Sequence, residues 1–299
     1  MSKVNQPPPY QEYESLNHDH NVQVPVEQRR SNVPEDFKYS VTISACEFEI
    51  RQKFMAKVYS ILSVQLLTTL VFSMLALRSK GLQLFIVNHM GLYILGIIVS
   101  LVTCLWIAWA PRRELYEMEN EISDPLVAGP SNGTSARSEN IPWYCLSKRG
   151  QYILLSLFTI SEAYCLGSSI MFVPQDIVMN AIVVTTVVVI GVTLMALSGK
   201  FEIALESAMS IYYWLNLALL VMIGIGISFL FMGGMGSKMN LFYGWIGAIV
   251  FTVYLFIDTQ LIFRQMFIGE EIKCALSLYL DIINLFLSIL RIMQSSDDN

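Results

Sequence analysis

Residues 254–262 read YLFIDTQLI and residues 278–286 read LYLDIINLF. Each stretch places an aspartate, Asp258 or Asp281, inside an apolar segment that is long enough to cross a lipid bilayer as a helix. An ionised side chain at membrane depth costs several kcal/mol unless it faces a cavity or a partner. Two such residues in successive segments therefore indicate a functional site as well as a membrane fold.

The composition of the whole chain agrees with that interpretation. Hydrophobic residues make up 54% of the 299 residues and charged residues only 14%. The apolar residues gather into blocks close to the ~20 residues that span a hydrocarbon core. The pattern predicts an all-α polytopic membrane protein with seven transmembrane helices, at residues 58–77, 91–110, 152–172, 177–197, 209–232, 242–263 and 275–293.

The positive charges predict how the chain is oriented. Lysine and arginine are enriched before the first predicted span and in the connection at about 111–150, and such charges favour the cytosol. We therefore expect the N-terminus and this loop to be cytosolic. Seven full crossings would place the tail after Arg291 on the other side, whereas a last segment that only dips into the bilayer would return it to the cytosol.

The first 50 residues differ from the rest of the chain. They are polar and have no sustained apolar period, so we expect a disordered cytosolic tail ahead of a transmembrane domain at residues 51–299. Pro7, Pro8, Pro9 and Tyr10 fit the PPxY pattern, in which a polyproline helix enters the aromatic groove of a WW domain. The motif predicts recruitment of a WW-domain ubiquitin ligase, and the alternative is a terminus that is merely rich in proline.

The motifs of common enzymes are missing from the sequence. The five cysteines are scattered without paired spacing, the three histidines form no metal-ligand pattern, and no phosphate loop, nucleophile elbow or HExxH occurs. We therefore expect no catalytic residues, no cofactor and no binding of nucleic acid. The lipid bilayer is the first partner that the composition predicts.

The two aspartates are predicted to lie at the same depth. Asp258 precedes Arg264 by six residues, and Asp281 follows Lys273 by eight. At the rise of an α-helix both carboxyl groups then lie roughly 9 to 12 Å inside the same membrane face. The spacing predicts a depth-matched pair on adjacent helices.

Such a pair has definite chemical consequences. Two acidic groups in a dry site cannot both ionise cheaply, so a proton is expected to be shared between Asp258 and Asp281. Loss of that proton would leave repelling carboxylates that either part or capture a hard cation such as Ca²⁺ through oxygen ligands. Arg112 and Arg113, at the end of the second span, reach the same face and are candidates for a latch on the pair.

Other residues suggest a purely structural interpretation. Glu162 is a third acidic group at depth, which either lines the same cavity or makes a separate helix contact. A polar side chain in a membrane helix often only joins neighbouring helices, and this role is open for Asp258, Asp281, Glu162, Asn284, Asn216 and Gln65. Small residues let helices approach closely, which is the simplest role for Gly224, Gly226, Gly244 and Gly247.

Three stretches together resemble a known family. Residues 54–67 (FMAKVYSILSVQLL), 254–262 and 278–286 are similar to the first and the last two spans of the lifeguard branch of the Bax inhibitor family. The resemblance runs from about Val33 to the C-terminus. Within the family the chain is most similar to the fungal member, which shares a Pro-rich tail with PPxY.

The resemblance implies a fold and a function. It implies a Bax inhibitor-like bundle of six helices around a central seventh, with Asp258 and Asp281 as the pH-sensitive gate of a calcium leak and with Arg112 or Arg113 as its latch. It also implies residence in the endoplasmic reticulum, or alternatively in vacuole, Golgi or mitochondrial membranes. Suppression of cell death and a link to the unfolded-protein response complete what the resemblance implies.

Two function classes remain as hypotheses. The first is a pH-gated calcium leak in an endomembrane, which opens as the aspartate pair loses its proton and lowers stored calcium. The second is a non-conducting scaffold for cell-death or stress regulators, recruited to a WW-domain ubiquitin ligase through residues 7–10. A proton-coupled transporter of an organic solute has little support, because no broken helix or further binding group indicates a substrate.

Overall fold

The computed structural model describes residues 48–110, 145–198, 200–201, 203–264 and 269–297. Seven of the helices in this part are long and apolar enough to cross a membrane, which confirms the predicted all-α polytopic fold. The short α3 was not predicted; it begins where Ser79 Oγ accepts a hydrogen bond from the Leu82 amide at 3.3 Å. The helices are α2 (Phe48–Arg78), α3 (Lys80–Asn88), α4 (Met90–Trp109), α6 (Lys148–Ile170), α7 (Gln175–Leu197), α8 (Leu205–Phe231), α9 (Ser237–Arg264) and α10 (Glu271–Asp297).

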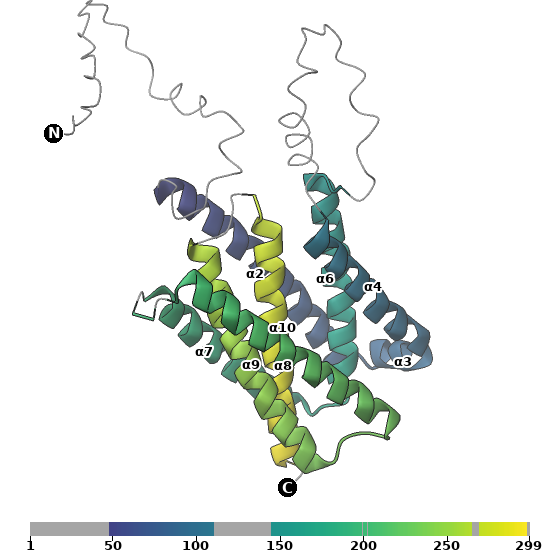
Figure 1. Cartoon of the computed structure of the whole chain (residues 1–299). Helices are drawn as coiled ribbons and strands as arrows, with labels where there is room; N and C mark the ends of the chain where they lie inside the picture. The colour runs from purple at the N-terminus through teal and green to yellow at the C-terminus, as the bar shows by residue number, and fades with distance from the viewer. Residues whose placement is uncertain (1–47, 111–144, 199, 202, 265–268, 298–299) are drawn as a thin grey trace, which may run out of the picture. The chain divides into compact units, whose positions relative to one another are not determined.

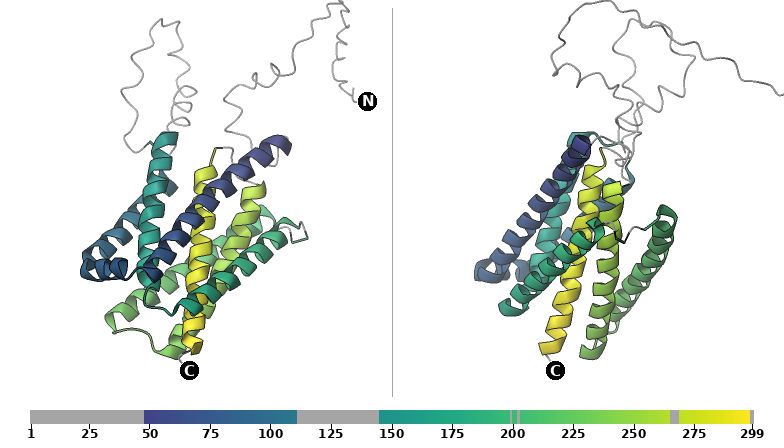
Figure 2. Two further views of the ribbon diagram at one scale, coloured as in Figure 1. Left: turned by 180° about the vertical axis from the view of Figure 1, so that it is seen from behind. Right: turned by 90° about the vertical axis from the view of Figure 1, so that its left-hand side faces the viewer.

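The last helix, α10, lies at the centre of the bundle. It packs against α2, α4, α6, α7 and α9, as the predicted central seventh helix requires. Figures 1 and 2 show α2, α4 and α6 on one side of α10, and α8 and α9 on the other. Helix α8 packs chiefly on α9 and lies at the outside of the bundle. The start of α2 and the end of α10 are at opposite ends of the bundle, as an odd number of crossings demands (Figure 1).

The core is densest where α9 and α10 meet. A Cβ atom on Gly247 would lie 2.5 Å from Ser288 Oγ, and one on Gly244 would lie 3.2 Å from the Ser288 carbonyl oxygen. Real Cβ atoms essentially never approach as closely as 2.5 Å and seldom as closely as 3.2 Å, so these two glycines let the helix backbones pack together, as predicted. The same prediction is wrong for Gly224 on α8, because no atom of a neighbouring helix in the described part of the chain lies within 4 Å of a Cβ placed there.

Candidate functional site: a buried aspartate pair

The structure brings Asp258 of α9 and Asp281 of α10 together in the core. Their exposed fractions are 4% and 7%, and the two carboxyl groups are near enough for the charge of one to act on the other. Both residues lie on α9 and α10, which pack extensively against each other. The two carboxyl groups that the spacing places at matching depth thus lie near each other in the core.

The hydrogen bonding of the pair is incomplete. Ser277 Oγ donates to Asp258 Oδ2. Asp258 Oδ1 and Asp281 Oδ2 are buried and have no hydrogen-bond donor among the described residues. Buried polar oxygens without a donor are costly, and two ionised carboxylates side by side in a low dielectric add repulsion. A proton held between the two carboxyl groups removes the repulsion and supplies a donor.

The end of the bundle that holds the pair is fastened by contacts from distant parts of the chain. Gln260, two residues after Asp258, donates from Nε2 to the Phe201 carbonyl at 2.5 Å and accepts from the Ile203 amide at 3.2 Å. Lys57 Nζ of α2 lies 3.1 Å from Glu271 Oε1 at the start of α10. These contacts join α9, close to Asp258, to the segment that follows α7, and the start of α10 to α2.

Several predicted site residues lie outside the described residues. They are the candidate latch residues Arg112 and Arg113 and the WW-domain motif at Pro7, Pro8 and Tyr10. The described part of the chain reaches Ala110, which follows the end of α4. The latch and the motif therefore stay predictions.

Glu162 occupies a different contact from the aspartate pair. Its Oε2 accepts a hydrogen bond of 2.5 Å from Ser100 Oγ, which joins α6 to α4. The recorded contacts of the aspartate pair are instead between α9 and α10. The bond to Ser100 corresponds to the separate helix contact considered for Glu162, and the role of Glu162 in lining a cavity stays a prediction.

The other polar side chains divide between helix contacts and local bonds. Gln65 Nε2 donates to Thr159 Oγ1 at 3.1 Å, joining α2 to α6, and Tyr254 Oη donates to Asn216 Oδ1 at 3.0 Å, joining α9 to α8. Both predicted helix contacts are confirmed. Asn284 instead donates to a carbonyl of its own helix, four residues earlier, at 2.8 Å. The predicted contact of Asn284 with a neighbouring helix is therefore wrong for its side-chain Nδ2, which donates to the Leu280 carbonyl of α10 itself.

A polar face runs along α10 that was not predicted from the sequence. Near the end of the helix opposite the aspartates, the Arg291 guanidinium lies 4.6 Å from the centre of the Tyr243 ring. A cavity of about 170 Å³ beside it is lined in part by Asn284, Ser288, Arg291 and Tyr243. Spacings of three and four residues, which place side chains on one helix face, could have revealed the series. Its members are Ser277, Asp281, Asn284, Ser288, Arg291 and Ser295.

The described residues offer few ligands for a stable metal centre at the aspartate pair. Within the described residues, no group of three or more His, Cys, Asp or Glu side chains is placed to hold a metal ion. Calcium prefers six to eight oxygen ligands, and two carboxylates with one serine hydroxyl do not make a full set by themselves. Calcium coordination by Asp258 and Asp281 stays a prediction.

Comparison with known proteins gives consistent matches over most of the chain. The family model described as "Inhibitor of apoptosis-promoting Bax1" matches residues 51–298. Bax inhibitor 1 of Saccharomyces cerevisiae is 50% identical over 298 residues, covering 98% of both chains. Protein lifeguard 4 of Mus musculus is 27% identical over 89% of this chain and 94% of its own length. The Golgi anti-apoptotic protein of Vaccinia virus is 26% identical over 89% of this chain and 95% of its own.

Proposed function

We propose that this chain, which belongs to the Bax inhibitor family of anti-apoptotic membrane proteins, is a pH-sensitive calcium leak of an endomembrane. Such a leak lowers the stored calcium and thereby suppresses stress-induced cell death. Membership in the family rests on a match that covers most of the chain, whereas the leak is inferred from the site.

One observation carries the proposal: two carboxyl groups meet in the core of a membrane bundle, and two of their oxygens have no hydrogen-bond donor among the described residues. Acidic residues in membrane-spanning segments are rare, because they are costly, and they commonly mark paths for ions or protons. A pair whose charge changes by losing one proton is suited to act as a switch. A purely structural contact would more simply use a neutral amide.

The direction of gating follows from the charge of the pair. At low cytosolic pH the shared proton joins Asp258 to Asp281, and the α9–α10 contact stays closed. At higher pH the proton leaves, and the two negative carboxylates repel each other and attract a cation. Flux is therefore expected to rise with pH and to fall on acidification.

The polar face of α10 supports a route for the ion. It extends from Ser277 and Asp281 to Ser288 and Arg291, where the 170 Å³ cavity lies. Because the aspartate pair offers few ligands, it would bind calcium only weakly and briefly. Weak binding of this kind suits conduction, which requires that an ion leave as well as enter.

The relatives support an endomembrane and an anti-apoptotic role. One relative is by its printed name a Golgi protein, and two names refer to inhibition of Bax or of apoptosis. We extend this to residence in the endoplasmic reticulum or a neighbouring compartment, with the N-terminus in the cytosol. A role in the unfolded-protein response, which responds to the calcium content of that compartment, is part of the proposal.

Calcium efflux from liposomes that contain the purified full chain tests the leak. Efflux is measured with an external indicator while the pH is stepped from 6 to 8, for the wild type, Asp258→Asn and Asp281→Asn. Wild-type flux should rise with pH, and each variant should lose most of this dependence, because a single carboxyl group has no charged neighbour to repel.

Glu162→Gln is the matched control, since it removes a carboxylate that bonds to Ser100 rather than to the pair. It should keep the pH dependence. Thermal unfolding of each variant establishes that the protein is folded. Flux that is absent at every pH in folded wild type would contradict the leak and favour the scaffold, whose partners would then be sought with a variant lacking residues 7–10.

A further inference from the structure

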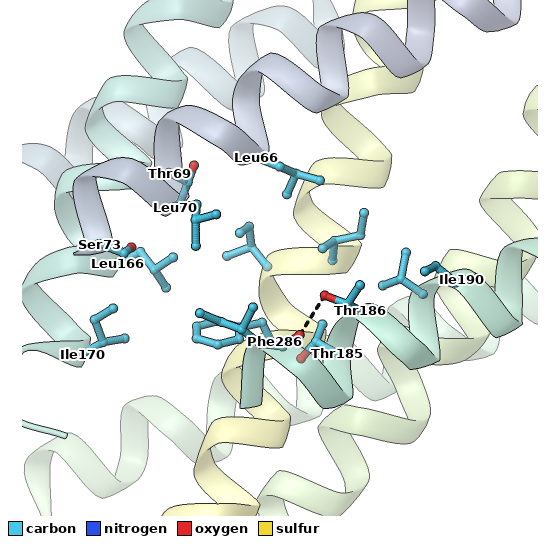
Figure 3. A pocket seen from close by; sticks show the side chains of 14 residues that line it. Leu66, Thr69, Leu70, Ser73, Leu166, Ile170, Thr185, Thr186, Ile190 and Phe286 are labelled. Atoms are coloured by element: carbon cyan, nitrogen blue, oxygen red, sulfur yellow. Dashed lines mark hydrogen bonds between the residues drawn. The ribbon is translucent and has the colours of Figure 1, made fainter. Parts of the chain in front are cut away.

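An apolar groove runs along the side of the bundle between α2 and α7. Figure 3 shows Leu66 and Leu70 of α2 on one side, Thr186 and Ile190 of α7 on the other, and Phe286 of α10 among the side chains between them. The groove has a volume of about 250 Å³. Leu70 and Ile190 are 39% and 55% exposed, so the groove opens to the outside of the bundle.

The helices and side chains that line the groove indicate which kind of molecule binds in it. The helices that line it are α2, α6, α7 and α10, and all four are long and apolar enough to cross a membrane, so its mouth faces lipid hydrocarbon. Water is a poor occupant, because a buried water needs two to four polar partners and this lining is almost entirely apolar. An apolar cavity of about 150 Å³ already accepts a molecule such as benzene. A hydrocarbon chain is therefore the occupant that fits the size and the chemistry.

One hydroxyl in the groove differs from the others. Thr69, Thr185 and Thr186 each donate to the backbone carbonyl four residues earlier, at 2.7 to 2.9 Å, which is the usual solution for a hydroxyl in a helix. Ser73 is only 5% exposed, and its Oγ has no hydrogen-bond partner in the described part of the chain. A buried hydroxyl without a hydrogen-bond partner is costly, so Ser73 is suited to donate to an acceptor on a molecule that binds in the groove.

The position of Ser73 along α2 indicates which acceptor this is. Ser73 lies five residues, about 8 Å, before the exposed Arg78 that ends α2. A terminal arginine marks the level of the lipid headgroups, so Ser73 lies near the ester groups of the adjacent leaflet. From there, Leu66 is seven residues deeper, about 10 Å, which provides a path for the attached chain toward the bilayer centre.

We propose that this groove binds one acyl chain of a glycerophospholipid from the leaflet at the Arg78 end of α2. The ester carbonyl accepts a hydrogen bond from Ser73 Oγ, and the chain lies between α2 and α7 against Phe286 of α10. The site is separate from the aspartate pair and does not depend on ion conduction.

Photochemical cross-linking tests the site in the full chain. The protein is placed in phosphatidylcholine liposomes in which a small fraction of the lipid carries a diazirine in the upper part of one acyl chain. After irradiation, mass spectrometry maps the lipid adducts. We expect adducts to concentrate on the groove-lining segments of α2 and α7, well above the level at Leu220 of α8, which is 66% exposed and outside the groove.

Two substitutions and a matched control make the test specific. Leu70→Trp fills the mouth of the groove from an exposed position and should lower the groove adducts at least about fivefold. Ser73→Ala should lower them about threefold, the usual effect of one hydrogen bond between partners in a membrane. Leu67→Trp places the same side chain on the same helix, at a position that is 62% exposed and does not line the groove, and should change nothing.

Three results would overturn the proposal. Adducts spread evenly over all exposed helix faces and unaffected by Leu70→Trp would mean a lipid annulus only. Unchanged adducts in Ser73→Ala would remove the ester contact from the site. Displacement of the labelled chain by added sterol, but not by unlabelled phosphatidylcholine, would assign the groove to a sterol.

Discussion

Helices α10 and α8 are both apolar enough to span a membrane, yet they are held in very different ways. Half of the most apolar 18-residue stretch of α10 is buried inside the bundle, against 6% of the corresponding stretch of α8. Helix α10 packs against five other helices, while α8 lies chiefly on α9. In a bilayer an apolar side chain gains little by leaving lipid for protein, so hydrophobicity alone does not decide which helix becomes the core.

Two kinds of residue allow other helices to pack around α10. Glycines on α9 remove the side chains that would hold α10 away, and polar side chains on α10 need partners that lipid does not supply. Helix α8 is joined to α9 by a few specific bonds, including those of Tyr254 with Asn216 and of Tyr243 Oη with the Met222 carbonyl at 2.9 Å. We infer that the site is built where packing is most constrained.

The largest test of this contrast compares one tyrosine from each helix. Tyr279 of α10 is fully buried, packs edge-on against Phe158 with ring centres 5.7 Å apart, and shares a 2.8 Å hydrogen bond with Thr69. Tyr279→Ala should lower the midpoint of thermal unfolding in detergent by about 6–15 °C, as expected for an aromatic cavity in a protein of this size. Tyr213→Ala on α8, where the side chain is 67% exposed, should shift it by about 2 °C or less. Equal shifts would mean that α8 is packed as tightly as α10.

A smaller effect is expected from adding one methyl group to a glycine. Gly247→Ala places a Cβ against Ser288, so α9 and α10 must move apart, at a cost of about 1–3 kcal/mol in unfolding free energy. Gly224→Ala on α8 meets no atom within 4 Å and should be neutral or stabilising, because alanine favours the helix by up to about 1 kcal/mol. Denaturant titration in micelles measures both. Destabilisation by Gly224→Ala to the same degree would place an unseen neighbour against α8.

One of the bonds that join α8 to α9 can be removed by itself. Tyr254→Phe deletes the hydroxyl that donates to Asn216 and should cost about 0.6 kcal/mol, the average for such bonds in membrane proteins. Amide hydrogen exchange should quicken on α8 while that of α10 is unchanged. Thr252→Val, which removes a hydroxyl that donates to the Ala248 carbonyl of its own helix α9, is the control. Faster exchange on α10 would show that the two helices are held as one unit.

The smallest effect concerns the ion pair between α2 and α10. Lys57 is 47% exposed, so its bond with Glu271 is screened and should contribute about 0.5 kcal/mol or less. Glu271→Gln should therefore lower the unfolding midpoint by about 2 °C or less, and raising the salt concentration should diminish the difference from wild type. A large shift that salt does not diminish would mean that charge, rather than packing, holds α10 in place.

The features of single helices were the ones that the sequence predicted best. The seven spans were predicted because each is an apolar block of sufficient length, but hydropathy locates the crossing and not the helix end. Helix α2 thus begins at Phe48 rather than at residue 58, since helical backbone continues through the charged residues before the span. The short α3 was missed for the same reason, because nine residues are too few for a span.

Relations between helices were harder to predict. Glu162, Asn216 and Asn284 look alike in the sequence as polar residues in apolar blocks, yet one joins α6 to α4, one joins α8 to α9, and one donates to its own helix. The rotation of each helix about its axis decides among these outcomes. The groove between α2 and α7 also depends on that rotation, as does the burial of Ser73 in it.

The sequence by itself predicted seven apolar helices long enough to span a membrane and two carboxylates at one depth, because hydrophobicity and helical rise are properties of a single segment. Only the tertiary structure decided that Asp258 and Asp281 meet in the core, that Glu162 lies in another contact and that α8 stays at the edge. The physical reason is that helices in lipid choose their neighbours by close fit at small residues such as Gly247 and by pairing of polar groups. Both depend on which helix faces are brought together.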